Sequence, residues 1–415
     1  MMQPARDQDA QVQQILDRLG ITPQQVLHHH HTFGDRLSAS TERLGARIPE
    51  PVLPPIADGL RWRINPETLH ANLQAALDPL GVGFCYIINR GGRLFAHHRS
   101  GEARVSLTVP WLGIVADPGL AWDIDVPTDI CSVSKFITAI ATLMLLDREG
   151  VSPLTPVANY LPDYWQLPVG NAAITFHQLL RHESGLGGQF TGSGAEGFTI
   201  ARVQMEIDAV GIGTYRYKNF NFLILRAALP VLAGVVPPEM SAGASLNDSL
   251  WDEVTRTFYR QFCNDHIFTA AGVGPFDFLA PPNSAFAYPT PPAWPGAQRT
   301  DGWIAAGSSA WFLTLEELMK VAAAFRYGGS MMSQNRANDL MTAQYGLNEI
   351  VNTNAGSVYA KRGNYISGAN ELETGLWFIP DDIELGMFIN SRRPVSGSYN
   401  DAIGPAIAAS AEVAV

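Results

Sequence analysis

The sequence predicts an α+β protein in which one antiparallel sheet is built from both ends of the chain, with a helical subdomain inserted between its strands. β-rich segments flank a turn at residues 90–92, and β character returns in residues 357–363 and 373–391. Between them, residues 128–150 have the pattern of a helix that is apolar around most of its circumference. We therefore expect an antiparallel sheet flanked by helices.

The composition allows a large interior and excludes some partners. Of the 415 residues, 46% are hydrophobic and 16% are charged, which suffices for two packed subdomains and an extension. The net charge of −11 repels phosphate backbones and anionic lipid, so we expect neither nucleic acid nor a membrane as a partner. Three cysteines form no disulfide framework and the first residues contain no apolar leader, so the sequence predicts a cytoplasmic protein.

The predicted organisation is an N-terminal extension over residues 1–60 and a main domain over residues 61–415. The main domain divides into a sheet subdomain, residues 61–130 and 300–415, and a helical subdomain, residues 131–299. Helical patterns occur at residues 174–182, 221–232, 249–262, 313–329 and 402–414, whereas the Pro-rich segment 281–296 is expected to be a loop.

The first candidate for chemistry is an S-x-x-K motif, Ser132 to Lys135, at the start of the apolar helix. Residues three apart share one face of a helix. At a helix start, Ser132 would meet free N–H groups and the positive end of the helix dipole, which favour a developing oxyanion. Desolvation should lower the pKa of Lys135 and suit it to accept a hydroxyl proton. Alone, the motif also fits a serine cap followed by a lysine that reaches solvent.

The second candidate is the segment Tyr217-Lys218-Asn219, 85 residues downstream of Ser132. A tyrosine near a lysine can act as a general base, and an asparagine can hold both a lysine and a substrate amide. Alone, the segment fits a core tyrosine that precedes a helix.

The third candidate is Lys361-Arg362-Gly363 on a predicted strand. The lysine supplies positive charge, and the glycine leaves room for a substrate along the strand. The N–H group of Asn364 can complete an oxyanion hole with that of Ser132. Alone, the segment fits a solvated basic turn.

In this order and with these long spacings, the three motifs resemble those of the serine β-lactamase and penicillin-binding-protein superfamily. The resemblance is strongest to the branch with class C β-lactamases, D-alanyl-D-alanine carboxypeptidases and family VIII esterases. The flanking segment ITFHQLLRHESGLGG is similar to the family's "LLTHTSGL" stretch, and GWIAAGSSAWFLTLEELMKVAAAFRYGG to "AAGGL-x-ST-x-x-DL". The resemblance covers about residues 75–400 and implies a β-lactamase/transpeptidase-like fold.

The resemblance also implies roles for the motif residues. Ser132 would be acylated, while Lys135 and Tyr217 manage its proton. Asn219 would contact the lysine and the acyl group, and Lys361 would assist the tyrosine and orient the substrate.

Two positions depart from the family pattern. Arg362 stands where β-lactamases of this type usually have a small Thr or Ser. A bulky cation there would obstruct or rearrange a β-lactam carboxylate site, which weakens the β-lactamase interpretation. Glu183 replaces the usual Thr after His182, which we interpret as a structural difference.

No cofactor or metal is expected. The adjacent histidines His28–His31 do not converge on one face of a helix or strand, and Gly192–Gly197 matches G-x-G-x-x-G with no preceding strand. Cys131 adjoins Ser132, but no histidine neighbours it in sequence, so we expect a buried small residue there.

The sequence thus predicts a serine hydrolase that forms an acyl-enzyme at Ser132 and acts on a small-molecule ester or amide. Carboxylic-ester hydrolysis is the leading hypothesis, because peptidoglycan peptides and β-lactams are met outside the cytoplasm. An acyltransferase, a D-amino-acid peptidase or carboxypeptidase, and a β-lactamase are alternatives. A catalytically silent scaffold of the same fold is an alternative of another class.

Overall fold

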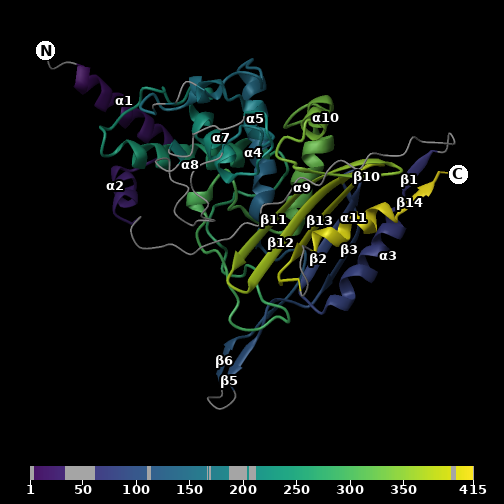
Figure 1. The fold of residues 1–415 in the computed structure, drawn as a ribbon. Helices are drawn as coiled ribbons and strands as arrows, with labels where there is room; N and C mark the ends of the chain where they lie inside the picture. The colour runs from purple at the N-terminus through teal and green to yellow at the C-terminus, as the bar shows by residue number, and fades with distance from the viewer. Residues whose placement is uncertain are drawn as a thin grey trace. The chain divides into compact units, whose positions relative to one another are not determined.

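The structure is a computed structural model that describes residues 4–32, 61–109, 114–165, 167, 170–186, 203–204, 212–393 and 399–414. Figure 1 shows its helices and strands. The chain divides into two compact units, and each name below covers only the described residues of its ranges. The helical unit comprises Met1–Ala39, Lys135–Ile267 and Trp303–Ser309; the sheet unit comprises Ser40–Ser134, Phe268–Gly302 and Ala310–Val415.

The centre of the sheet unit is a six-stranded antiparallel sheet in the order β10-β11-β12-β13-β2-β3 (Figure 1). Its strands are β10 (Glu349–Thr353), β11 (Gly356–Ser367), β12 (Asn370–Ile379), β13 (Ile383–Ile389), β2 (Phe84–Arg90) and β3 (Arg93–Ser100). The hairpin of β2 and β3 joins four strands from the far end of the chain. The predicted α+β class, with a sheet built from both chain ends, is confirmed.

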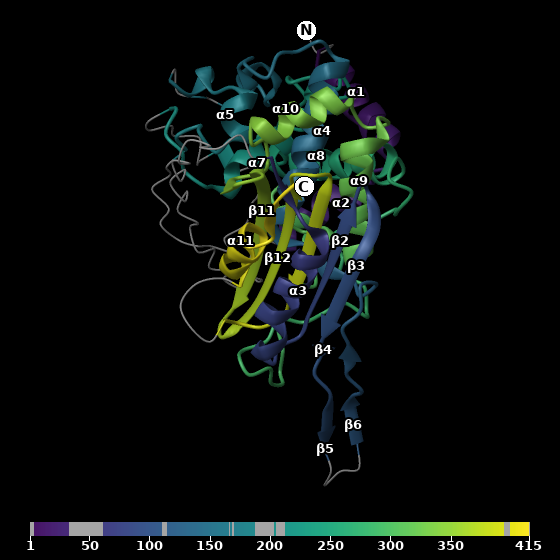
Figure 2. The ribbon, with the colours of Figure 1, turned by 90° about the vertical axis from the view of Figure 1, so that its right-hand side faces the viewer.

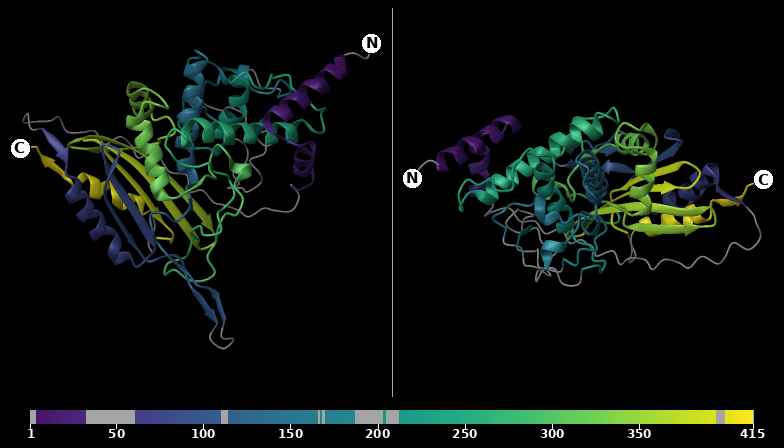
Figure 3. Two further views of the ribbon diagram at one scale, coloured as in Figure 1. Left: turned by 180° about the vertical axis from the view of Figure 1, so that it is seen from behind. Right: turned by 90° about the horizontal axis from the view of Figure 1, so that it is seen from above.

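Helices cover both faces of this sheet, as the view from behind in Figure 3 shows. On one face, α3 (Pro66–Leu77) and α11 (Asn400–Ala408) bury leucine and isoleucine side chains in a core with the strands. Leu385 and Met387 of β13 belong to that core. Since side chains alternate along a strand, Gly386 faces the other way, and a Cβ there would lie 2.5 Å from Met319 Sδ of α9 (Leu315–Ala323).

Local signals explain where some elements begin and end. Thr314 and Glu317 form a capping box that starts α9. This helix continues into a π-helical turn, η8 (Ala324–Gly328), and Gly329 follows that turn with a φ of +68°. The predicted closing helix is shorter than expected, because α11 ends at Ala408 and Ala411–Val413 form strand β14. That strand pairs with β1 (Trp62–Ile64).

The remaining elements of the sheet unit are short. Strands β5 and β6 pair and extend away from the main sheet (Figure 2). The others are η1 (Asp78–Leu80), α10 (Gln334–Thr342), and the strands β4 (Glu102–Arg104), β5 (Leu107–Val109), β6 (Ile114–Asp117), β7 (Leu120–Ala121), β8 (Thr128–Asp129) and β9 (Phe312–Leu313).

The helical unit is built around α4 (Ser134–Arg148), of which all residues from Lys135 onward belong to this unit. The helix is buried on nearly all sides, as its sequence predicts. The predicted helix over residues 174–182 is only a short one, α5, where Thr175 caps residues Phe176–Leu180. The other helices of the unit are α1 (Pro4–Leu19), α2 (Pro23–Thr32), α7 (Asn219–Leu232), α8 (Asn247–Cys263), η4 (Val157–Tyr160), η5 (Asn171–Ala173), η6 (Asn264–Phe268, up to Ile267) and η7 (Trp303–Ala305).

The two units divide the chain differently from the ranges predicted for the subdomains. Helices α1 and α2 pack on α8, and Gln261 Nε2 donates to Leu19 O at 3.0 Å. Residues 268–302, which include the Pro-rich loop, belong to the sheet unit. There Tyr288 is buried, and its hydroxyl accepts a hydrogen bond from Val105 N at 2.8 Å.

Some predictions fall outside what the structure describes, namely the Pro-rich part of the predicted extension, the Gly192–Gly197 segment and the side chains of His28–His31. Among the described helices, none is long and apolar enough to cross a membrane.

Candidate active site

Ser132 lies in a tight turn that precedes the buried helix, not in the helix itself. The residues Cys131–Val133 form a 3₁₀ turn, and α4 begins at Ser134. Cys131 has a φ of +50°, which is uncommon for a residue with a side chain, and strained backbone of this kind clusters at functional sites. Asp129 Oδ1 holds the turn by accepting from Cys131 N at 2.7 Å.

Strand β11 runs directly beside this turn, as the K-x-G motif predicts. A Cβ atom on Gly363 would lie 2.6 Å from the backbone nitrogen of Ser132, so only glycine fits. Thr374, which pairs with Gly363 in the sheet register, donates its hydroxyl to Ile130 O at 2.9 Å. Thr374 therefore ties β12 to the chain just before the serine, and the backbone nitrogen of Ser132 lies close to Gly363 of β11.

Thr374 is a site residue that the sequence analysis missed. It has no motif around it, and only the pairing of β11 with β12 places it opposite Gly363. Asn364 is the next residue of β11, paired with Glu373. Its N–H group as the second oxyanion donor remains a prediction.

Lys361 is almost fully buried on β11, and its Nζ donates to Asn348 Oδ1 at 2.7 Å. Asn348 directly precedes β10, so the segment that leads into the edge strand holds the lysine. Because side chains alternate along a strand, Lys361 and Gly363 lie on one face of β11 and Arg362 lies on the other.

The Arg362 guanidinium is engaged by two carboxylates. It binds Glu349 of β10 through Nε and Asp401 of α11 through Nη1, the latter at 2.6 Å. Burial by itself would lower the pKa of Arg362, but the charges and hydrogen bonds of these two acids raise it above its ordinary value. This cation is therefore directed to the α11 face of the sheet, away from the face that carries Gly363.

The helical unit brings the S-x-x-K lysine together with the Y-x-N motif. Lys135 is fully buried, and its Nζ donates to Asn219 Oδ1 at 2.6 Å and to Ser308 O at 2.7 Å. The ammonium also lies 5.0 Å from the centre of the Tyr217 ring, within the range of a cation–π interaction. Two motifs separated by 84 residues thus meet at one ammonium group.

His182 supports the segment that carries Tyr217, a role that the sequence analysis did not assign. Its Nδ1 accepts from Asn221 Nδ2 at 2.9 Å and from Lys218 N at 3.3 Å. Its ring centre lies 4.4 Å from that of Tyr217. The backbone of His182 has a φ of +58°. The H-E-S-G segment therefore positions the tyrosine, and Ser184 completes the support by donating to Asn221 Oδ1 at 2.5 Å.

We expect His182→Asn to lower kcat/KM for an ester substrate by about tenfold, because Tyr217 loses the ring that packs against it. Asparagine is chosen because it tolerates a positive φ, so the backbone of this segment is retained. Stopped-flow hydrolysis of p-nitrophenyl butyrate, with thermal unfolding measured in parallel, checks this. Unchanged kcat/KM in a protein of unchanged stability would contradict the positioning role.

Each predicted site residue can now be placed. The sheet unit holds Ser132, Lys361, Gly363 and Asn364, and it brings Gly363 against Ser132. The helical unit holds Lys135, Tyr217 and Asn219 and brings all three together. Cys131 is buried and contacts Asp129 through both its N–H and its thiol, which agrees with a structural residue. In the described part of the chain, no three His, Cys, Asp or Glu residues are grouped to hold a metal ion.

The fold and these motifs define a class of protein, and comparison with known families identifies it. The Beta-lactamase family model matches residues 87–412. The chain belongs to this family, and so to the superfamily of β-lactamases and penicillin-binding proteins, whose members are serine hydrolases that act through an acyl-enzyme.

Individual relatives agree with this assignment. PbpX of Bacillus subtilis (strain 168), which bears a penicillin-binding-protein name, is 30% identical over 146 residues, or 34% of this chain and 30% of that protein. The match therefore spans less than two thirds of that relative's own length.

Solved structures show the fold. A penicillin-binding protein homologue from Pyrococcus abyssi, described as octameric, has a TM-score of 0.58 at 16% identity, over 83% of this chain and 77% of that chain. FmtA from Staphylococcus aureus has a TM-score of 0.58 at 14% identity, over 86% and 93%. A class C β-lactamase from Rhodobacter sphaeroides has a TM-score of 0.52 at 15% identity, over 83% and 98%. The predicted β-lactamase/transpeptidase-like fold is confirmed.

Proposed function

We propose that this protein is a carboxylic-ester hydrolase that forms an acyl-enzyme at Ser132. The observation that carries the proposal is the 2.6 Å hydrogen bond from Lys135 Nζ to Asn219 Oδ1. It joins the S-x-x-K and Y-x-N motifs, and it leaves the lysine buried next to the Tyr217 ring. A scaffold that only binds ligands has no need to bury a lysine three residues after Ser132 and hold it with two hydrogen bonds.

In the proposed reaction Ser132 Oγ attacks the ester carbonyl, and the bond from carbon to the leaving alcohol oxygen breaks. Tyr217, whose deprotonated form the neighbouring Lys135 ammonium would stabilise, takes the serine proton and passes it to that alcohol. Water then attacks the acyl carbon, the bond from that carbon to Ser132 Oγ breaks, and the proton of the water passes through Tyr217 to Ser132 Oγ as the carboxylic acid leaves. The N–H groups of Ser132 and Asn364 stabilise the oxyanion of both steps.

The surroundings of Arg362 support an ester over a β-lactam. β-Lactams of the common types carry a carboxylate that must be recognised, whereas a simple ester does not. The Arg362 guanidinium is bound by Glu349 and Asp401 on the α11 face, so it offers no charge to a carboxylate on the face that carries Gly363. A neutral substrate is therefore the better match to this strand.

Labelling with a fluorophosphonate tests the nucleophile. We expect one adduct per chain, and fragmentation of the labelled peptide should place it on Ser132 and not on the neighbouring Cys131 or Ser134. Heat-denatured protein serves as the control, because an activated serine needs the folded site. No adduct would favour a silent scaffold, and an adduct at another residue would move the nucleophile.

The substrate class is tested by substrate turnover, measured with unlabelled enzyme from a preparation that reacts with the fluorophosphonate. We expect p-nitrophenyl butyrate to be hydrolysed with a kcat/KM at least about tenfold above that for nitrocefin or a D-alanyl-D-alanine peptide. An alcohol acceptor is added in a parallel series. Product formation that depends on the acceptor would assign an acyltransferase, and preference for the peptide would assign a carboxypeptidase.

A further inference from the structure

Three consecutive backbone carbonyls in the helical unit each accept a hydrogen bond from a different buried side chain. Arg226 Nη1 donates to Ala306 O at 3.1 Å, Thr138 Oγ1 to Gly307 O at 2.6 Å, and Lys135 Nζ to Ser308 O at 2.7 Å. All three side chains are fully buried. The segment Ala306–Ser308 therefore connects Arg226 to the ammonium group of Lys135.

This segment has little freedom of its own. Gly307 has a φ of +97°, and a Cβ there would lie 3.0 Å from both Arg226 Cβ and Phe222 O. Ser308 closes the turn through its side chain, which donates to Ala305 O at 3.0 Å. A displacement of Ala306 O is therefore transmitted to Ser308 O two residues on.

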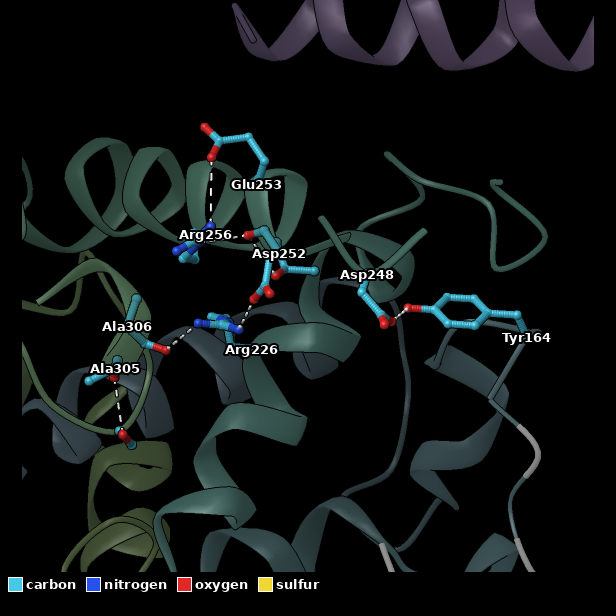
Figure 4. Close-up of polar contacts among 10 residues, drawn as sticks. Tyr164, Arg226, Asp248, Asp252, Glu253, Arg256, Ala305 and Ala306 are labelled. Atoms are coloured by element: carbon cyan, nitrogen blue, oxygen red, sulfur yellow. Dashed lines mark hydrogen bonds and ion pairs between the residues drawn. The ribbon is translucent and has the colours of Figure 1, made fainter. Parts of the chain in front are cut away.

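Arg226 is itself held within a buried cluster of charges, drawn in Figure 4. Its Nη2 contacts Asp252 Oδ1 at 3.3 Å, and Arg256 Nε donates to Asp252 O at 2.9 Å. Arg256 also lies 3.7 Å from Glu253. Burial lowers the pKa of Arg226 to about 10, against the opposing charge of Asp252, so the group remains a cation at neutral pH.

A buried ion pair of this kind is a weak source of stability, because desolvation of both charges offsets their attraction. The arginine side chain instead fixes the relative positions of its two hydrogen-bond partners. One planar group reaches a carboxylate on α8 and a carbonyl before Gly307 at the same time. A lysine presents one nitrogen where the arginine uses two, so it cannot keep both contacts in the same geometry.

We propose that Arg226 is a positioning residue for Lys135: by fixing Ala306 O it fixes Ser308 O, which sets where the lysine ammonium rests. The proposal builds on the acyl-enzyme function proposed above. It adds a residue that carries no motif and touches no predicted catalytic side chain.

The test compares Arg226→Lys with Arg256→Lys. Both variants keep the charge, and both change an arginine of the same buried cluster, but only Arg226 contacts the 306–308 segment among the contacts described. We expect Arg226→Lys to slow phosphonylation of Ser132 by about 10- to 100-fold, since small misplacement of a catalytic group has effects of this size. The midpoint of its pH–rate profile should move by about one unit, while Arg256→Lys keeps the wild-type profile.

A second readout does not depend on activity. Acetic anhydride footprinting followed by mass spectrometry measures how readily Lys135 is acetylated. We expect faster acetylation of Lys135 in Arg226→Lys than in Arg256→Lys or the wild type, with the exposed Lys320 as the internal reference. If Arg226→Lys does not fold, Gly307→Ala takes its place, because its Cβ pushes the same segment away from Arg226.

The outcomes separate the two proposals. If the wild type takes no phosphonate but Lys135 becomes reactive only in Arg226→Lys, the positioning role stands and the hydrolase function falls. If Arg226→Lys matches Arg256→Lys in labelling rate, pH profile and acetylation of Lys135, the positioning role is overturned, whether or not the protein hydrolyses esters.

Discussion

Ser132→Ala is expected to reduce p-nitrophenyl butyrate hydrolysis by about 10³-fold or more while the protein remains folded. Removing a covalent nucleophile forces water to attack directly, without the acyl-enzyme that divides the reaction into two easier steps. The turn around Ser132 is held by Asp129 and by Thr374, not by the serine hydroxyl alone. The measurement is steady-state hydrolysis with circular dichroism melting of both proteins.

Ser134→Ala is the matched control for this variant. Ser134 is two residues away and equally buried, and its hydroxyl accepts from Trp311 N at 3.3 Å. Its loss should cost about 1 kcal/mol of stability and leave most of the activity. If the two alanine variants hydrolyse the ester equally fast, Ser132 is not the nucleophile and the assignment of the S-x-x-K motif fails.

Gly363→Ala should have the second-largest effect, a loss of about 10²-fold or more in the rate of Ser132 phosphonylation. The added methyl group would lie 2.6 Å from Ser132 N, a backbone atom, and 2.8 Å from Cys131 Cβ, which is bonded directly to the backbone, so neither can rotate away. Either β11 or the serine turn must shift, and an oxyanion donor moves with it. The rate constant for fluorophosphonate labelling measures this directly.

Gly404→Ala is the control for the glycine substitution. A Cβ at Gly404 in α11 would make only ordinary contacts, the nearest at 3.6 Å from Val351 Cγ2. Alanine is also the better helix former, so stability should be equal or slightly higher. Wild-type labelling by Gly363→Ala would show that β11 does not form part of the oxyanion site.

Local pattern was sufficient for much of the fold. The apolar periodicity of residues 135–148, the hairpin of β2 and β3 and the alternating strands near the C-terminus are all signals contained in short windows. The patterns were less reliable at element ends. The segment at 174–182 has a helical pattern, yet only Phe176–Leu180 form a helix, because His182 takes a positive φ and places its ring against Tyr217.

The motifs did not predict the local backbone at Ser132 or the direction of the Arg362 side chain. S-x-x-K predicted Ser132 as the first residue of a helix, but the chain makes a 3₁₀ turn with Cys131 at positive φ before α4 begins. The sequence could not show this, because the turn is imposed by Asp129 and by the strand beside it. The sequence likewise predicted that Arg362 would obstruct or rearrange a β-lactam carboxylate site, and it could not show that Glu349 and Asp401 draw that side chain to the other face of β11.

By itself, the sequence determined which residue types carry the chemistry, their order along the chain and the α+β class, since these depend on motifs and periodicity within short segments. Only the tertiary structure decided which residues support them. Thr374 donates to the backbone just before the serine turn, Asn348 accepts from Lys361 and His182 packs against Tyr217, and none of the three belongs to a recognised catalytic motif. Their partners are chosen by sheet register and helix packing, where contacts between distant segments fix each hydrogen bond.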